Sequence, residues 1–302
     1  MSELKQLEER IARLKEGLKA VIVAHNYQRP EVQDVADFVG DSLELARRCT
    51  EVDAETIVFC GVRFMAETAV ILNPERTVLL SEGSAGCPLA DMITTGELRQ
   101  WRERYPRAAV VCYVNSSAEI KAGSDICCTS ANAAEVVNSL ESDEILFVPD
   151  QNLGHYVSTQ TTKKIILYPG FCYLHHRIQA EQLKRAMKRH PEARAIVHPE
   201  CRPEVIALAE AALSTSQMLR HVKASPHKSF IIGTEEGLLH RLHLENPDKS
   251  FHLISDNQIC IDMKRTTLQI LAQTMELKQN TVTVPEEVRL KAREAVERML
   301  AI

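Results

Sequence analysis

The sequence lacks long apolar runs, Cys-x-x-Cys pairs and any Gly-x-Gly-x-x-Gly fingerprint, and it has a single tryptophan in 302 residues. Its apolar stretches are short pieces such as Val21–Ala24, so we expect no membrane span. The polar N-terminus lacks the apolar segment of a signal peptide. Aromatic residues make up 5%, which disfavours a base-stacking platform. These absences predict a cytoplasmic protein that binds neither membrane nor nucleic acid, and the chain lacks the dinucleotide-binding fingerprint.

The charge balance points the same way. The chain has 36 Lys and Arg against 41 Asp and Glu, a net charge of −5. A net negative charge disfavours general affinity for nucleic acid or for anionic membranes. It leaves open a local basic pocket for an anionic substrate. Hydrophobic residues at 45% and charged residues at 25% are typical of a folded globular protein.

Cysteine, by contrast, is plentiful, with nine residues. An odd number without a secretion signal disfavours a disulfide framework. The missing Cys-x-x-Cys pairs disfavour zinc ribbons and two-cluster ferredoxins. The question is therefore which cysteines differ from the buried apolar residues that free cysteines usually are.

A unit of about 87 residues is repeated three times along the chain. Each unit contains three short runs rich in β-branched residues, separated by segments with helical periodicity. We expect strands at 19–25, 56–60 and 77–81, at 108–115, 144–148 and 164–168, and at 193–198, 229–233 and 251–255. Expected helices are 2–18, 31–50, 64–72, 135–140, 203–213 and 285–301.

This alternation predicts an α/β fold of three similar small parallel-sheet αβα domains. Pseudo-threefold symmetry would relate them, with the active site at their central junction. The expected domains are residues 1–87, 88–175 and 176–264. Residues 265–302 are expected to pack back on the first domain.

One cysteine follows the third strand of each unit, namely Cys87, Cys172 and Cys260. Threefold symmetry would bring the three thiols to one axis. Thiolates select zinc, copper(I) or iron–sulfur clusters. A [4Fe–4S] cluster held by three cysteines would keep one iron open as a Lewis acid. Three small buried residues in a symmetric core are the alternative, and spacing alone does not decide between them.

Polar residues gather after the expected strands, where open α/β sheets bind ligands. His25, Tyr113, Asn115, His198 and Glu200 follow equivalent strands, and a carboxylate beside a histidine suits acid–base catalysis. Hydroxyl groups precede helical segments at Ser42, Ser130 and Thr215. Each could cap a helix or bind an anion. The combination predicts a dehydratase or condensing enzyme that acts on small acids or phosphates.

The motifs that contain these residues resemble the quinolinate synthase family, iron–sulfur enzymes of de novo NAD biosynthesis. They span nearly the whole chain: Ala24–Ser42, Gly86–Met92, Tyr113–Lys121, Cys128–Asn132, Val148–Asp150, Gly170–Cys172, His198–Cys201, Ser214–Ser216, Gly233–Glu235, and Cys260 with Met263 and Lys264. The resemblance implies a [4Fe–4S] cluster on Cys87, Cys172 and Cys260, with one iron open to substrate.

The same resemblance implies an activity and a set of roles. Iminoaspartate and dihydroxyacetone phosphate would condense to quinolinate, releasing phosphate and water, and the aspartate-oxidising enzyme could make transient contact. Glu200, Tyr27 and His198 would be catalytic. Substrate would be bound by His25, Ser42, Tyr113, Asn115, Ser130, His198, Glu200 and Thr215.

Some positions depart from the family pattern, and two other functions stay open. Leu213 stands where glycine is common, Gln151 where lysine is common, and Tyr168 where tryptophan is frequent. Ile261 and Asp262 replace a usual Pro-Asn. A different cluster-dependent hydro-lyase could use the same three cysteines, and a non-catalytic metal sensor would bind metal without turnover.

Overall fold

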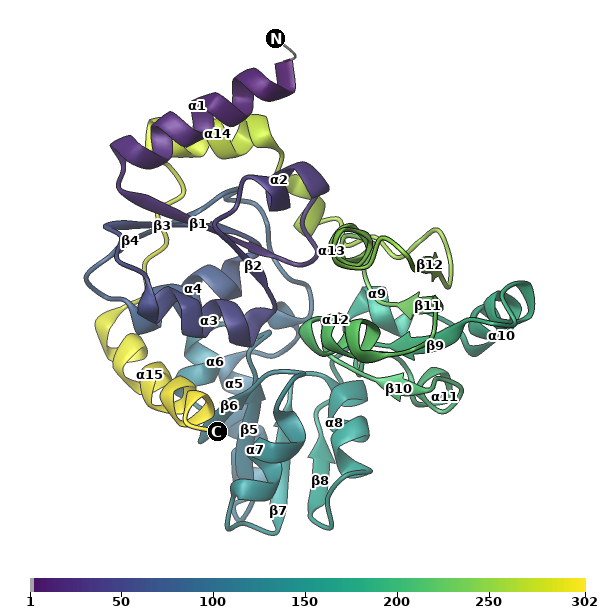
Figure 1. Ribbon diagram of the computed structural model, residues 1–302. Coiled ribbons are helices and arrows are strands. Elements are labelled where there is room, and N and C mark those ends of the chain that lie inside the picture. Colours follow the sequence, from purple (N-terminus) through teal and green to yellow (C-terminus); the bar gives the residue numbers. More distant parts are fainter. Residues whose placement is uncertain (1–2) are drawn as a thin grey trace.

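A computed structural model describes residues 3–302 and shows three lobes around a common centre (Figure 1). Each lobe holds a four-stranded parallel sheet flanked by helices. The strand order is the same in all three sheets, with the first strand of each unit between its second and third. This confirms the predicted class of three similar αβα domains. The domain boundaries stay a prediction, and residue 2 of the expected first helix lies outside the described residues.

The first sheet has the order β2-β1-β3-β4. Its strands are β1 (Ala20–His25), β2 (Phe38–Gly40), β3 (Thr56–Cys60) and β4 (Thr77–Leu80). The helices around it are α1 (Glu3–Gly17), α2 (Pro30–Asp34), α3 (Ser42–Glu51) and α4 (Arg63–Leu72). Strand β3 is buried along its whole length, as expected of a central parallel strand covered on both faces.

The second sheet has the order β6-β5-β7-β8. Its strands are β5 (Ala109–Tyr113), β6 (Ile126–Cys128), β7 (Glu144–Val148) and β8 (Lys164–Leu167). The accompanying helices are the 3₁₀ turn η1 (Ala90–Met92), α5 (Thr95–Arg104), α6 (Ala118–Ala122), α7 (Ala133–Ser139) and α8 (Gln151–Ser158).

The third sheet has the order β10-β9-β11-β12. Its strands are β9 (Arg194–Val197), β10 (Ala211–Ala212), β11 (Ser229–Gly233) and β12 (Ser250–Leu253). The helices are α9 (Tyr173–His176), α10 (Ala180–Arg189), α11 (Pro203–Ile206), α12 (Thr215–Ala224) and α13 (Leu238–Glu245). The carboxyl ends of these strands face the centre of the molecule, where the other two lobes meet (Figure 1).

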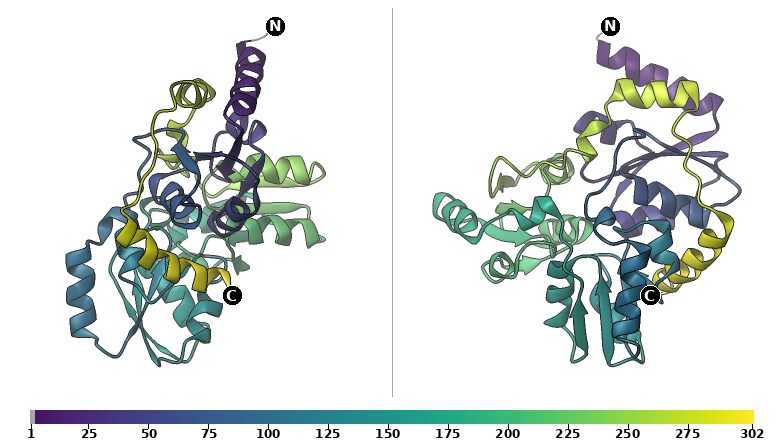
Figure 2. Two further views of the ribbon diagram at one scale, coloured as in Figure 1. Left: turned by 90° about the vertical axis from the view of Figure 1, so that its left-hand side faces the viewer. Right: turned by 180° about the vertical axis from the view of Figure 1, so that it is seen from behind.

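The C-terminal segment returns across the first two lobes (Figure 2). After the 3₁₀ turn η2 (Met263–Arg265), α14 (Leu268–Leu277) packs on α1. Helix α15 (Glu286–Leu300) then packs on α4 of the first lobe and on α6 and β6 of the second. It thereby covers the seam between these lobes.

Two long predicted helices are wrong. Residues 31–50 form α2, strand β2 and α3 instead of one helix, and residues 203–213 form α11 and strand β10. In the second unit, β6 is likewise a strand that the sequence analysis missed. These strands have two or three residues and lie at sheet edges. A strand this short shows no clear two-residue alternation, so helical periodicity on either side of it dominates the pattern.

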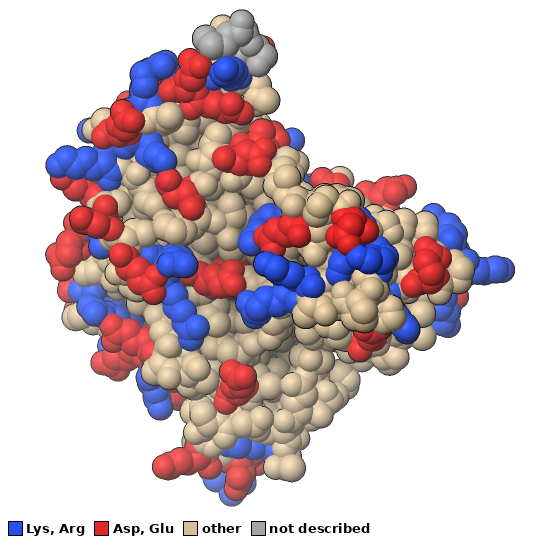
Figure 3. All heavy atoms as spheres, in the orientation of Figure 1, with Lys and Arg blue, Asp and Glu red and all other residues tan. Residues whose placement is uncertain are grey.

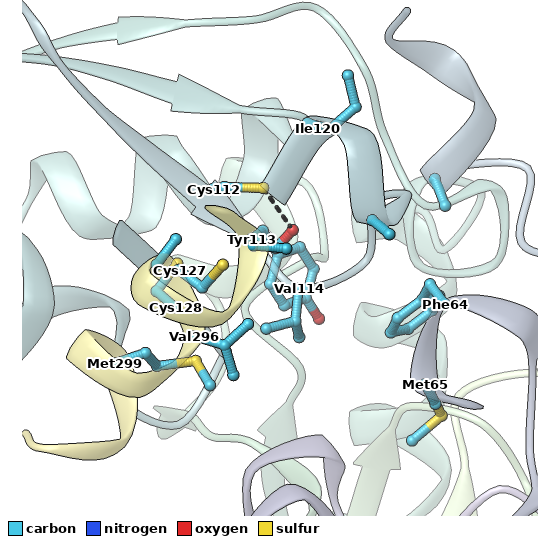
Figure 4. Close-up of a cluster of buried hydrophobic side chains, with 14 of the residues drawn as sticks. Phe64, Met65, Cys112, Tyr113, Val114, Ile120, Cys127, Cys128, Val296 and Met299 are labelled. Carbon is cyan, nitrogen blue, oxygen red and sulfur yellow. Dashed lines mark hydrogen bonds between the residues drawn. The ribbon is translucent and has the colours of Figure 1, made fainter. Parts of the chain in front are cut away.

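The first two lobes share one hydrophobic core, whereas the third has clusters of its own. Figure 4 shows Phe64 and Met65 of α4 on one side of Val114, and Val296 and Met299 of α15 beside the cysteines of β6. Each large apolar side chain buried in this way stabilises the fold by about 1.5–3 kcal/mol. The shared core therefore fixes the first and second lobes against each other.

No helix among residues 3–302 is long and apolar enough to cross a membrane. On the face drawn in Figure 3, acidic and basic residues are interspersed over all three lobes.

Candidate active site

Every residue that the sequence analysis assigned to the site lines one pocket at the junction of the three lobes. The space between the lining atoms is about 770 Å³, including the part open to solvent. The structure brings together His25, Tyr27, Ser42, Cys87, Tyr113, Asn115, Ser130, Cys172, His198, Glu200, Thr215 and Cys260. Repetition of one strand order places equivalent loops of each lobe at this point, because parallel strands present their carboxyl ends at one edge.

Cys87, Cys172 and Cys260 lie in the loops that follow β4, β8 and β12. They are partly exposed to the pocket, whereas the other six cysteines are buried. Burial raises the pKa of the Cys172 thiol well above its usual value, and the negative charges of Glu200, Cys87 and Cys260 raise it further. Thiolates that line one pocket repel one another, so a positively charged group among them would stabilise the set.

Two buried carboxylates hold the backbone of two of these cysteines. The Cys172 amide donates to Asp150 Oδ2 at 3.0 Å, and the Cys260 amide donates to Glu235 Oε1 at 3.1 Å. Asp150 and Glu235 occupy matching places, two residues after β7 and β11. Glu235 also accepts from Lys264 Nζ at 3.1 Å. In the second and third lobes, the cysteine loop is therefore held by the same kind of hydrogen bond, from the cysteine amide to a buried carboxylate.

Hydroxyl groups reach the pocket from the start of a helix in each lobe. Ser42 and Thr215 are the first residues of α3 and α12, and Ser130 precedes α7. Asp41 caps α3 by accepting hydrogen bonds from Leu43 N and Glu44 N, so the Ser42 hydroxyl is not the cap. Helix N-termini carry partial positive charge, so these positions suit carboxylate or phosphate oxygens.

A chain of hydrogen bonds joins Tyr27 to Glu200. The Tyr27 hydroxyl lies 2.6 Å from Thr234 Oγ1, which lies 2.9 Å from His175 Nε2. His175 Nδ1 lies 2.7 Å from Glu200 Oε2. One consistent direction has Tyr27 donating to Thr234, Thr234 to the ring nitrogen, and the opposite ring N–H to the carboxylate. The arrangement can move a proton between a phenol and a carboxylate.

His198 extends the chain toward the second lobe. Its Nδ1 lies 3.2 Å from Glu200 Oε2, its Nε2 lies 3.2 Å from Ser130 Oγ, and its ring stacks on His175 at 4.5 Å. Glu200 is thus held between two imidazoles, and both contacts use the same oxygen.

The surroundings shift the pKa values of Glu200 and Tyr27 in opposite directions. Burial opposes ionisation of Glu200, but His175 and His198 outweigh it and hold the pKa of this carboxyl well below its usual value. Burial lowers the pKa of His175, and the charge of Glu200 opposes this shift. Burial, followed by the charge of Glu200, raises the pKa of Tyr27 well above its usual value. The resting site therefore pairs a carboxylate with a protonated phenol.

His25 is a neutral donor at the pocket wall. Burial, followed by the charge of His198, lowers its pKa to about 3. Its Nδ1 accepts from the amide of Tyr27 at 3.2 Å, which leaves the proton on Nε2. Thr215 Oγ1 similarly accepts from Asn26 Nδ2 at 2.8 Å, so its own O–H is available for a ligand.

Two acceptors in the pocket have no hydrogen-bond partner among residues 3–302, namely Glu200 Oε1 and Asn115 Oδ1. A buried acceptor left unpaired costs about 1–3 kcal/mol. A ligand that brings O–H or N–H groups would satisfy both atoms.

The sequence analysis did not assign His175 or Thr234 to the site, and Glu235 was missed as well. His175 is three residues after Cys172, and this Cys-x-x-His spacing on a short helix was its only signal. Thr234 and Glu235 belong to the Gly233–Glu235 motif, but nothing in one sequence tells that their side chains face Tyr27 and Cys260. The thiol of Cys172 and the ligand atoms of His175 and Glu200 also lie within 4.8 Å of one another, a set that could hold a metal ion.

Comparisons with known proteins agree with this geometry. The family model "Quinolinate synthetase A protein" matches residues 9–301. The chain is 58% identical over 293 residues to a quinolinate synthase of Dehalococcoides mccartyi, covering 97% of each chain. It is 54% identical over 302 residues to one of Methanoregula boonei, covering 100% of each, and 55% identical over 295 residues to one of Thermodesulfovibrio yellowstonii, covering 97% of each. The chain belongs to the quinolinate synthetase A family.

Proposed function

We propose that this enzyme is a quinolinate synthase that condenses iminoaspartate with dihydroxyacetone phosphate and releases phosphate and water. One observation supports this proposal most directly. Three partly exposed thiols, a carboxylate between two histidines and a buried tyrosine line the same pocket. The names and high identity of the relatives support the same reaction. An aspartate-oxidising enzyme supplies the imine in this proposal. Nine free cysteines favour a reducing cytoplasm.

The donor set fits a [4Fe–4S] cluster held by Cys87, Cys172 and Cys260. Soft thiolates are the ligands that such clusters take, and mutual repulsion among the three calls for a positive partner. With three cysteine ligands, the bound cluster supplies an open iron that acts as a Lewis acid toward a substrate oxygen.

The pocket's own residues bind and orient the two substrates. Both substrates are anionic, and the helix starts at Ser42, Ser130 and Thr215 offer hydroxyl donors with favourable dipoles. His25 adds an N–H donor. The unpaired oxygens of Glu200 and Asn115 accept from the amino or hydroxyl groups that react. Such fixed contacts hold the reacting carbons together, which lowers the entropic part of the barrier.

Proton transfer in this proposal runs through the Tyr27–Thr234–His175–Glu200 chain. Condensation and loss of water require a base to take a proton from carbon and an acid to protonate a departing hydroxyl. Glu200 is ionised at rest and serves as the base. Tyr27 is protonated at rest and serves as the acid, and the chain restores both states between steps.

The test begins with anaerobically purified protein. We expect about four iron and four sulfide per chain, and quinolinate only when both substrates are supplied. Cys172→Ala should lose the cluster, whereas Cys49→Ala, at a buried position outside the pocket, should keep it. Zinc in place of iron, or full cluster absorbance in Cys172→Ala, would overturn the cofactor assignment.

Glu200→Gln tests the acid–base role apart from the cofactor. The amide keeps the size of the side chain but cannot take up a proton, so turnover should fall at least 100-fold, the usual effect of losing a general base. Iron content and visible absorbance should stay at the wild-type level. Near-normal turnover would remove Glu200 from this role.

A further inference from the structure

A second group of metal-ligating side chains lies in the third lobe, outside the pocket. His190 caps the end of α10, Glu192 lies in the connection from α10 to β9, and His252 is on the edge strand β12. One ligand atom from each residue lies within 4.8 Å of the other two. None of the three lines the pocket at the lobe junction.

The fold directs these side chains toward one another. Leu183 and Ala186 of α10 pack with Ile254 in one apolar cluster, so α10 covers the face of the sheet to which Ile254 points. Side chains two apart on a strand share a face, so His252 faces α10 as well. It meets His190 where the helix ends, with ring centroids 3.6 Å apart and planes at 11°.

The ring nitrogens of this pair are available. Within residues 3–302, the two rings contact each other, and no hydrogen bond joins a ring nitrogen of His190 or His252 to the protein. Burial lowers the pKa of His252, and the charges of His190 and Arg189 lower it further. Glu192 Oε1 accepts only a long hydrogen bond, 3.3 Å, from Ser229 Oγ. Two imidazoles free of hydrogen bonds beside a carboxylate are a donor set for a borderline metal ion.

We propose that His190, Glu192 and His252 form a metal site that binds a divalent transition-metal ion, with zinc as the representative. Two imidazole nitrogens and one carboxylate oxygen are a common zinc ligand set, and water would complete the tetrahedron. The proposal is independent of the quinolinate synthase assignment.

Binding requires a small local adjustment. Zinc bonds of 2.0–2.1 Å place tetrahedral ligand atoms about 3.4 Å apart. The three ligand atoms lie within 4.8 Å of one another in the structure, so they must move closer together to bind the ion. The two stacked rings must also turn about χ2, a soft torsion, so that their lone pairs converge. The bound ion would tie the α10–β9 connection to the edge strand β12.

The experiment measures zinc bound by the anaerobically reconstituted enzyme after equilibrium dialysis. We expect one zinc per chain beyond the metal of the cysteine site. Glu192→Gln keeps an oxygen that accepts from Ser229 but removes the charged ligand. Because Glu192 is exposed, the substitution should leave the stability of the fold unchanged. It should weaken zinc binding at least about tenfold, as should His252→Gln. His155→Gln changes an exposed histidine on α8 and is the matched control.

A second readout is thermal stability. Zinc should raise the midpoint of thermal unfolding of the wild type and of His155→Gln, because a ligand that binds only the folded state stabilises it. The midpoint of Glu192→Gln should respond much less. Equal zinc content in the wild type and in Glu192→Gln, or no zinc beyond the cysteine site, would overturn the proposal. The assignment of quinolinate synthesis would be unaffected.

Discussion

Glu235 is a buried carboxylate whose oxygen holds the amide of Cys260 while Lys264 balances its charge. Burial raises the pKa of Glu235 to about 7, so its negative charge beside one predicted cluster ligand is present above that pH. Asp150 accepts from the amide of another, and burial, followed by the charge of Glu200, raises the pKa of Asp150 well above its usual value. Hydrogen bonds and net charge near a cluster set its reduction potential. The proposed cluster would therefore be tuned by these two residues, which lie outside the ligand set.

Glu235→Gln should shift the reduction potential of the cluster to more positive values. The amide oxygen can still accept from Cys260 N. Above pH 7, where Glu235 is ionised in the wild type, the variant lacks the negative charge that disfavours an added electron. The measurement is a potentiometric titration of the reconstituted protein. Glu236→Gln, at the neighbouring and more exposed acid, is the control and should leave the potential near that of the wild type. A negative shift in Glu235→Gln would contradict the prediction.

His25 makes the stability of the fold depend on pH. Its folded pKa of about 3 lies below the usual 6.5, so the unfolded chain takes up a proton that the folded chain refuses. Stability from this group is full above pH 6.5 and is lost as the pH falls from 6.5 toward 3. The loss is about 2 kcal/mol between pH 7 and pH 5.

Denaturant unfolding at pH 7 and pH 5 checks this prediction. His25→Gln should lose less of its free energy of unfolding over this interval than the wild type, because it has no imidazole to titrate. His155→Gln should behave like the wild type, since His155 is exposed. An identical pH dependence in His25→Gln and the wild type would show that this histidine is protonated equally in both states.

At the scale of elements, one residue at the start of α3 both stabilises the helix and helps to position the pocket. Asp41 caps α3 and also accepts from Ser214 Oγ at 3.2 Å, at the cap of α12. Two helix starts, each carrying a predicted anion-binding hydroxyl, are thus tied together. Thr94 caps α5 through the same capping-box pattern, away from the pocket.

Asp41→Ala and Thr94→Ala should each lower the free energy of unfolding by about 1 kcal/mol, the usual cost of a lost N-cap. Only Asp41→Ala should also raise KM, because it frees the helix start that carries Ser42. Thermal unfolding and steady-state kinetics measure the two effects. A similar KM in both variants would separate the α3 cap from substrate binding.

The sequence predicted the elements whose patterns are long enough to be seen. Continuous apolar runs such as 56–60 gave the central strands, and their repetition gave three lobes and the matching cysteines. The edge strands β2 and β10 were missed because two or three residues are too few to show a two-residue alternation. Thr234 was missed for a different reason. Its role comes from facing Tyr27 across a lobe boundary, which local pattern does not encode.

On the scale of the whole molecule, the pocket exists only while the three lobes keep their positions relative to one another. Its walls come from every lobe, and hydrogen bonds such as Asn152 Nδ2 to Glu200 O, at 3.0 Å, cross between them. The third lobe has its own apolar clusters, and polar contacts such as Asn26 Nδ2 to Thr215 Oγ1 join it to the first lobe. We therefore expect the third lobe to move relative to the other two when substrates enter and water is excluded.

Helix α15 has the opposite effect, because it holds the first and second lobes together. Met299 is fully buried and lies beside the cysteines of β6 (Figure 4). It also lines a small pocket with Phe64 and Met65 of α4. Met299→Ala should lower the free energy of unfolding by about 2–5 kcal/mol, since truncation adds cavity to lost burial. Leu290→Ala, on the same helix but 50% exposed, should cost far less. Thermal unfolding followed by calorimetry measures both. If α15 couples the lobes, Met299→Ala lowers the midpoint of the first and second lobes together, whereas an unchanged midpoint would show that the seam is held without it.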